Sequence, residues 1–144
     1  MRLQLFLALG ILCFPEFGFA AAEPTGIAFA QSASATVWCR DANPPAAFAC
    51  AVDKCRREAA GEACHPTRWC APAGWSGAMV TWLPEFHATT VVCGASNEAA
   101  VLAALKALCD ATPELTRCDP VAVIDPDGVE TAQQDLSWPG PATR

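Results

Sequence analysis

The sequence predicts an α+β domain stabilised by disulfides, in which a mostly antiparallel sheet carries two helices on one face. Three observations lead to this expectation. Cysteine is abundant, with 9 residues in a chain of 144. A ββαβ-like order of elements can be traced twice along the chain. Hydrophobic residues make up 53% of the chain and charged residues 17%, which is typical of folded rather than disordered proteins.

The first 22 residues are interpreted as a secretory signal peptide. Arg2 provides a positive start, and the run 5–14 is uncharged and mostly apolar. Small-x-small patterns at 18–20 and 20–22 favour cleavage after Ala20 or Ala22. An apolar run this short cannot cross a membrane, because a spanning helix needs about 20 residues. We therefore expect no transmembrane anchor after cleavage, and a periplasmic or secreted location in a bacterium.

The mature chain repeats itself once. Cleavage removes Cys13 and leaves eight cysteines, an even number that favours disulfides in an exported protein. Three of them recur after 54 residues, as the pairs Cys39/Cys93, Cys55/Cys109 and Cys64/Cys118. Thr36, Val37, Asn43 and Pro66 recur in the same register. This self-similarity predicts a single compact domain at 23–124, made of two repeats at about 25–70 and 76–124.

Each repeat is predicted to contain a hairpin, a helix and a further strand. We expect strands at 26–30, 35–38, 67–71, 77–82, 89–93 and 121–124. Asn43 caps the first helix, with Pro44 at its first position, and that helix extends to about Glu58. Asn97 caps the second helix, whose apolar residues recur with helical period. The polar segment 125–144 is rich in Pro and Gly and is predicted to be a flexible acidic tail.

The spacing of these elements resembles that of the domain-of-unknown-function 4189 family, whose members are small exported bacterial proteins. The resemblance covers about 26–124. It rests on a Gly-led hairpin, on the capped helix that runs from Asn97 to Cys109, and on Cys118 just before a Val-rich strand, all of which occur twice. It implies export and the same fold, and it implies no activity and no catalytic residue.

The repeat restricts the disulfide pairing. Cys55 and Cys64 flank the end of the first helix and the start of the next strand, and Cys109 and Cys118 have the same spacing. We therefore predict the bonds Cys55–Cys64 and Cys109–Cys118. The four other cysteines are expected to form Cys39–Cys93 between the repeats and Cys50–Cys70 within the first, with an exchange of partners among these four as the alternative.

Motifs for catalysis or metal binding are weak. Cys55, Cys64, His65 and Cys70 include ligand types that zinc accepts, but the spacing contains no CxxC pair and export favours disulfides. We expect no metal and no cofactor. No nucleophile, phosphate-binding or paired-carboxylate motif was found, so no catalytic residue is assigned. The alternative is a small envelope hydrolase that uses His87 or His65 with a nearby carboxylate.

The candidate binding residues lie around the second hairpin. That hairpin is longer than the first and places apolar side chains at its tip. A tryptophan also lies in the Gly- and Pro-containing connection between the repeats. The predicted set is Trp75, Leu83, Glu85, Phe86 and His87. Aromatic side chains on a rigid frame are typical of recognition surfaces.

The charge balance limits the class of partner. Fifteen Asp and Glu against 9 Lys and Arg give a net charge of −6, which excludes a generic nucleic-acid binder. The sequence therefore predicts an exported, non-catalytic binding module. Its partner is expected to be an envelope or extracellular protein of unknown identity, and a periplasmic inhibitor or immunity-type protein is the sharper form of this hypothesis.

Overall fold

The computed structural model describes residues 25–143, so the predicted signal peptide at 1–22 lies outside the described residues and stays a prediction. The described elements follow in the order β1 (Gly26–Gln31), β2 (Thr36–Asp41), α1 (Pro44–Glu58), β3 (His65–Cys70), β4 (Trp75–Trp82), β5 (His87–Ala95), α2 (Glu98–Ala111), β6 (Arg117–Ile124), β7 (Glu130–Ala132), β8 (Trp138–Pro139) and the short 3₁₀ helix η1 (Pro141–Thr143). The α+β class is confirmed. No helix among the described residues is long and apolar enough to cross a membrane.

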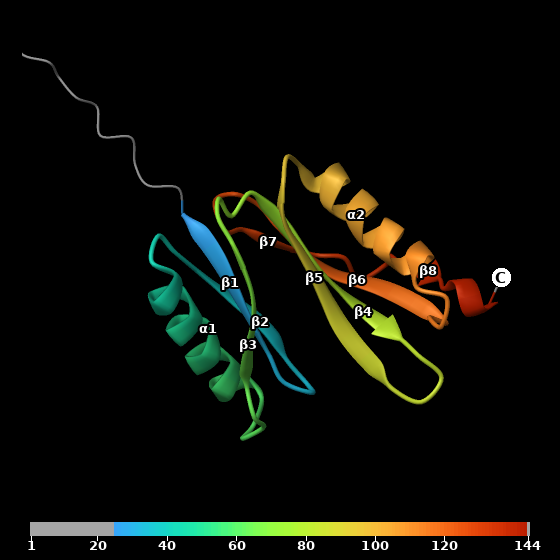
Figure 1. Ribbon diagram of the computed structural model, residues 1–144, viewed down its shortest axis with the longest axis horizontal. Coiled ribbons are helices and arrows are strands. Elements are labelled where there is room, and N and C mark those ends of the chain that lie inside the picture. The colour runs from blue at the N-terminus through green and yellow to red at the C-terminus, as the bar shows by residue number, and fades with distance from the viewer. Residues whose placement is uncertain (1–24, 144) are drawn as a thin grey trace, which may run out of the picture.

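Two antiparallel sheets form the centre of the molecule (Figure 1). The first sheet has the strand order β2-β1-β3, and the second has the order β5-β4-β6-β7, with β8 also paired to β6. The central strands β1 and β4 are each paired on both sides. The two sheets face each other, and an apolar cluster that includes Ile27, Phe29 and Ile124 lies between them.

The helices lie on opposite outer sides of the paired sheets, not together on one face as the sequence predicted (Figure 1). The reason is visible in β1, which is apolar on both faces. Ala28 and Ala30 pack under α1, whereas Ile27 and Phe29 point toward the second sheet. Since successive strand residues face opposite ways, a strand that is buried on both faces needs a layer on each side.

The helix boundaries follow from capping and from apolar spacing, as expected. The Asn43 and Asn97 side chains accept hydrogen bonds from the third helical N–H, at 3.3 Å from Ala46 N and at 2.9 Å from Ala100 N. Each helix buries one residue per turn against its sheet. These residues are Ala47, Ala51 and Cys55 in α1, and Val101, Leu105 and Cys109 in α2.

The two halves share an irregularity as well as an order of elements. The pairing of β1 with β3 shifts by one residue at Thr67, and the pairing of β4 with β6 shifts by one residue at Val121. These bulged residues are 54 positions apart, the same offset that relates the cysteines. The shared topology is consistent with two copies of one unit, and the duplication itself stays a prediction.

Four disulfides connect the elements. Cys55–Cys64 and Cys109–Cys118 join the end of each helix to the following strand region, which confirms both of those predictions. The other four cysteines form Cys39–Cys50, between β2 and α1, and Cys70–Cys93, between the two sheets. The predicted bonds Cys39–Cys93 and Cys50–Cys70 are therefore wrong, and the exchange of partners that had been left open is what the structure contains.

A β-bulge explains why Cys39 and Cys93 do not meet. In the second hairpin Trp75 pairs with Ala95 but Gly77 pairs with Val92, so β5 contains one extra residue, next to Gly94 at φ +79°. A shift of one residue turns a strand side chain to the opposite face. Cys39 therefore faces α1, whereas Cys93 faces the space between the sheets.

The C-terminal segment is not the loose tail that the sequence predicted. β7 and β8 both pair with β6, and Trp138 packs against the cluster beneath α2. Gly140 lies close against Leu115, where an added Cβ would meet the Leu115 carbonyl oxygen at 2.0 Å. The proline and glycine content that suggested a flexible tail instead permits two short strands and a tight turn.

Candidate binding surface

The turn between β4 and β5 places three of the predicted residues together. Leu83, Glu85 and Phe86 lie in this turn, which is closed by a hydrogen bond of 2.8 Å from Leu83 N to Phe86 O. Leu83 is half-buried and packs against the cluster beneath α2, so it anchors the turn. Phe86 lies in the same turn with 62% of its surface exposed.

The remaining two predicted residues lie apart from each other. His87 is the first residue of β5 and adjoins the turn. Trp75 is the first residue of β4, at the opposite end of that strand, and packs against the cluster beneath α2. Trp75 therefore does not contribute to a surface at the hairpin tip.

A cross-strand row continues the surface from β5 to β6. Trp82 on β4 lies directly opposite His87 on one side and Arg117 on the other. The Arg117 guanidinium carbon is 4.5 Å from the Trp82 ring centroid, and the His87 ring centroid is 5.2 Å from it. Such a geometry favours cation–π attraction between Arg117 and Trp82. No local sequence motif indicates this row, because its members come from three strands.

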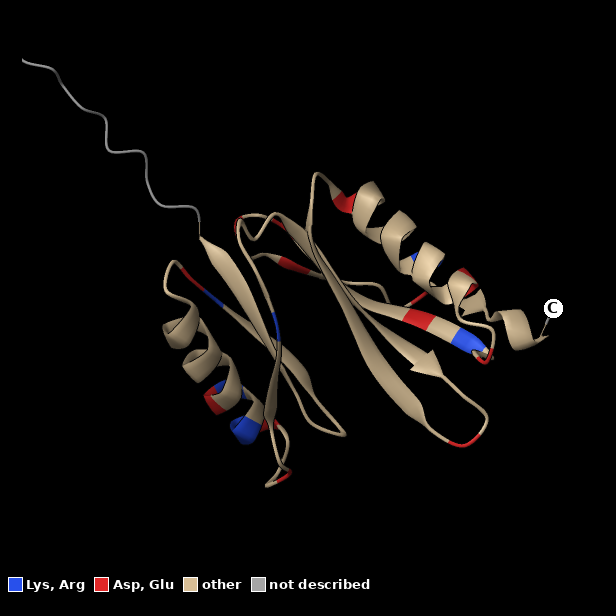
Figure 2. Ribbon diagram, in the orientation of Figure 1, with Lys and Arg blue, Asp and Glu red and all other residues tan. Residues whose placement is uncertain are grey.

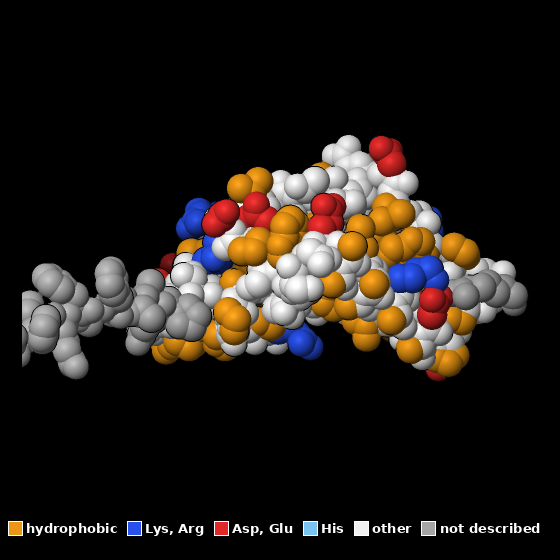
Figure 3. Space-filling model, turned by 90° about the horizontal axis from the view of Figure 1, so that it is seen from above, with side chains coloured by type: hydrophobic (Ala, Val, Ile, Leu, Met, Phe, Trp, Pro, Cys, Tyr) orange, Lys and Arg blue, Asp and Glu red, His pale blue; other side chains and the backbone are white. Residues whose placement is uncertain are grey.

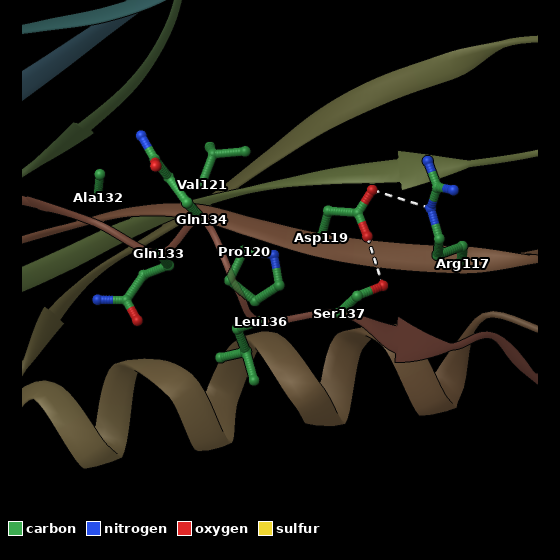
Figure 4. Close-up of a pocket in the computed structure, with 9 residues that line it drawn as sticks. All are labelled: Arg117, Asp119, Pro120, Val121, Ala132, Gln133, Gln134, Leu136 and Ser137. Atoms are coloured by element: carbon green, nitrogen blue, oxygen red, sulfur yellow. Dashed lines mark hydrogen bonds and ion pairs between the residues drawn. The ribbon is translucent and has the colours of Figure 1, made fainter.

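Asp119 holds the row in place (Figure 4). Its Oδ2 accepts hydrogen bonds from Trp82 Nε1 at 2.6 Å and from Arg117 Nε at 2.9 Å, and its Oδ1 accepts from Ser137 Oγ at 2.6 Å. Charge-assisted bonds of this kind are stronger than neutral ones. The carboxylate thus links β4 and β6 to the C-terminal segment. We call the surface formed by Trp82, Leu83, Phe86, His87 and Arg117 the hairpin end.

Two shallow hollows adjoin the hairpin end. The larger, of about 460 Å³, lies between β6 and the C-terminal segment, and Figure 4 shows Asp119 between Arg117 and Ser137 at one side of it. The smaller, of about 240 Å³, lies between the β1–β2 turn and the second sheet. Val121 lines both hollows and is 40% exposed. The hollows are open and of mixed polarity, which suits contact with a broad partner surface.

The histidines are not arranged for acid–base chemistry in the described part of the chain. His65 begins β3 in the first sheet and His87 begins β5 in the second, so the structure does not bring them together. Among the described residues neither imidazole forms a hydrogen bond or ion pair with a carboxylate, and Asp119 accepts hydrogen bonds from Trp82, Arg117 and Ser137. No observation therefore favours the hydrolase alternative.

The described cysteines are committed to disulfides. All eight are paired, and within residues 25–143 no three His, Cys, Asp or Glu side chains converge as metal ligands. Charged side chains of both signs are scattered among hydrophobic ones on the face shown in Figure 3. This face carries no continuous positive patch of the kind that nucleic-acid binding requires.

Fold and surface together define a disulfide-stabilised α+β domain with two packed antiparallel sheets and an exposed aromatic hairpin. No family model, curated protein or solved structure matches this chain. The hairpin end must therefore be interpreted from its own geometry.

Proposed function

We propose that this protein is an exported binding module that contacts another envelope or extracellular protein through the hairpin end. The observation that carries the proposal is the 62% exposure of Phe86 on a turn whose neighbours are fixed. Leu83 anchors one side of that turn in the core, and the Trp82–Asp119 hydrogen bond fixes the strand below it. A large apolar side chain held rigidly in water loses little entropy when a partner covers it.

Four disulfides support the exported part of the proposal. Disulfides persist in oxidising compartments and are rare in the cytosol. The resemblance to the domain-of-unknown-function 4189 family gives the same expectation of export. In the sharper form of the proposal, the protein is an inhibitor or immunity-type protein that inserts the hairpin tip at 83–87 into a cleft of its partner.

Site-specific photocrosslinking in the native cell tests this proposal. The chain offers a matched pair of positions, because Phe86 is 62% exposed and Val129 is 61% exposed. Val129 follows the end of β6 that pairs with the start of β4, so it lies at the far end of the second sheet from the turn. A crosslinker at position 86 is expected to give one discrete adduct, and a crosslinker at position 129 none.

Binding to the protein identified in that adduct then provides the quantitative test. Phe86→Asp should weaken binding by about tenfold or more, since buried aromatic anchors commonly contribute 2 kcal/mol or more, whereas Val129→Asp should leave it unchanged. An absence of adducts at position 86, or an equal effect of the two substitutions, would show that the hairpin end is not a contact surface.

A further inference from the structure

The strand β5 is an edge strand without charged residues or proline. It is the outer strand of the second sheet and the longest outer strand described, with nine residues. Proteins usually protect edge strands with charges, prolines or short length. The other outer strands show these devices, since β2 ends in Arg40 and Asp41, β3 contains Pro66 and Arg68, and β7 has three residues. β5 contains no Lys, Arg, Asp, Glu or Pro.

The turn geometry shows which backbone groups of β5 point outward. Leu83 N donates to Phe86 O, so these residues form a hydrogen-bonded pair, and every second pair along the antiparallel ladder does the same. The intervening residues on β5, His87, Thr89 and Val91, therefore direct their N–H and C=O groups away from β4. A second observation agrees, because Gln31 Nε2 donates to the Thr89 carbonyl at 3.3 Å from outside the ladder.

A hollow beside this edge carries positive charge. It measures about 240 Å³ and is lined by Gln31, Thr67, Arg68, Thr89, Thr90 and Val91. Arg68 extends from β3 on the same side as Phe29, its cross-strand partner, and so points toward the second sheet. Neither β3 nor β5 contains an acidic residue, and Arg68 is the only Lys or Arg on these two strands. In Figure 2 neither ribbon carries red.

We propose that β5 accepts an extended acidic segment of the partner protein as an added strand. The outward groups of His87, Thr89 and Val91 supply the backbone hydrogen bonds once the incoming strand displaces the Gln31 amide from the Thr89 carbonyl, and Arg68 receives a carboxylate of that strand. This inference rests on the proposed binding function and adds to it the mode of recognition and the chemistry of the partner. Phe86, at the start of the same edge, then contacts the end of the added strand.

A second copy of this chain fits the edge less well than an acidic partner. Antiparallel pairing of two β5 strands about Thr89 would bring the two Arg68 side chains to the same place. Like charges at a shared position oppose such a pairing. An incoming carboxylate at that position forms a charge-assisted bond instead.

Two synthetic peptides test the proposal on the mature protein with its disulfides intact. The acidic probe is the blocked peptide Ser-Thr-Glu-Val-Glu-Thr-Ser, and its control replaces both glutamates by lysine. Hydrogen exchange measured by NMR should show that the acidic peptide slows exchange at the amides of His87, Thr89 and Val91. The basic peptide should bind at least about tenfold more weakly, and Arg68→Glu should reverse this preference.

A matched pair of variants isolates the backbone contribution. Thr89→Pro removes an outward N–H that the β4 ladder does not use, whereas Thr89→Ala keeps it. Thr89→Pro should abolish binding of the acidic peptide and Thr89→Ala should preserve it. If Thr89→Pro does not fold, a second form of the acidic peptide is used with the unaltered protein. This form is N-methylated at the backbone amides of its valine and its second threonine, and it should fail to bind.

Several results would overturn the inference. The first is an absence of binding by the acidic peptide at millimolar concentration, and the second is equal binding of both peptides. The third is protection from hydrogen exchange at amides other than those of His87, Thr89 and Val91. The fourth is a concentration-dependent dimer that dissociates in the Thr89→Pro variant. The last result would assign the edge to a second copy. Crosslinking from position 86 that persists in Thr89→Pro would also reject strand addition, while leaving the proposed binding function intact.

Discussion

The indole nitrogen of Trp38 donates a hydrogen bond of 2.9 Å to the carboxylate of Glu130, across 92 residues of chain. Trp38 lies on β2 in the first sheet, and Glu130 begins β7 at the edge of the second. The C-terminal segment therefore contacts both halves. Together with the Cys70–Cys93 bond, this contact connects the two sheets at both of their sides.

Removal of residues 125–144 is expected to destabilise the protein. The deletion removes β7, β8 and Trp138, which packs against the cluster beneath α2. The partly buried Trp138 alone is expected to contribute about 1 kcal/mol or more. Urea unfolding of the shortened chain should show a decrease of at least that size. An unchanged free energy of unfolding would mean that the segment is a dispensable tail, as the sequence had suggested.

The sequence predicted the local structure more reliably than its assembly. Asparagine caps and apolar spacing located both helices, and the helix-to-strand cysteine spacing gave two disulfides. The order of the layers was not predictable from the sequence. It depends on the second sheet covering Ile27 and Phe29, and the alternation of side chains along a strand does not show what covers either face. The bulge beside Gly94 inverted the direction of Cys93, and a gapless comparison of the repeats does not detect an inserted strand residue.

For the candidate surface, too, the sequence predicted the local part and not the part that depends on assembly. Phe86 and Leu83 were located from the unexpected apolar residues of a turn, and the structure places them in it. The row of Arg117, Trp82 and His87 depends on pairing across three strands, so no local motif indicates it. Trp75 was predicted from its place in the Gly- and Pro-containing connection between the repeats, but it begins β4, so the length of that strand separates it from the turn.

The Cys70–Cys93 disulfide between the sheets should contribute more to stability than the Cys39–Cys50 disulfide beside α1. Cys70–Cys93 closes a sequence separation of 23, and Cys39–Cys50 a separation of 11. Either bond is expected to contribute about 3 kcal/mol in the chain-entropy model, and doubling the loop adds about 0.6 kcal/mol. Cys70→Ser with Cys93→Ser should therefore lower the free energy of unfolding more than Cys39→Ser with Cys50→Ser. The opposite order, measured by urea unfolding, would contradict this ranking.

Asp119 should be more important for stability than an ordinary surface carboxylate. Asp119→Ala leaves the Trp82 indole N–H and the Arg117 guanidinium without their shared acceptor, at an expected cost of about 1–3 kcal/mol. Asp119→Asn keeps an acceptor oxygen and should cost less. Unfolding measurements give the energies, and the NMR shift of the Trp82 indole proton reports the bond. Equal stability of Asp119→Ala and the unaltered protein would exclude this role.

Glu62 should titrate below the ordinary range of glutamate. Side-chain hydrogen bonds from Ser32, and then from Ser34, lower the pKa of its carboxyl, and Ser34 N also donates to Glu62 Oε2 at 3.0 Å. A lowered folded-state pKa stabilises the fold above the ordinary glutamate pKa, and this contribution is lost as the pH falls through the lowered value. In an NMR titration the Ser34 amide shift should follow the Glu62 carboxyl. Glu62→Gln should abolish that acidic transition, and its persistence in the variant would assign it to another group.

A peptide map of the protein from the exported fraction, made without reduction and with free thiols alkylated beforehand, tests the central claim most directly. The map reports the N-terminus and the state of every cysteine in one measurement. We expect an N-terminus created by cleavage after Ala20 or Ala22 and no alkylated cysteine. The expected bonds are Cys39–Cys50, Cys55–Cys64, Cys70–Cys93 and Cys109–Cys118. An intact Met1 with alkylated cysteines would contradict export and the disulfide frame together. A Cys39–Cys93 bond would contradict the packing of the two sheets.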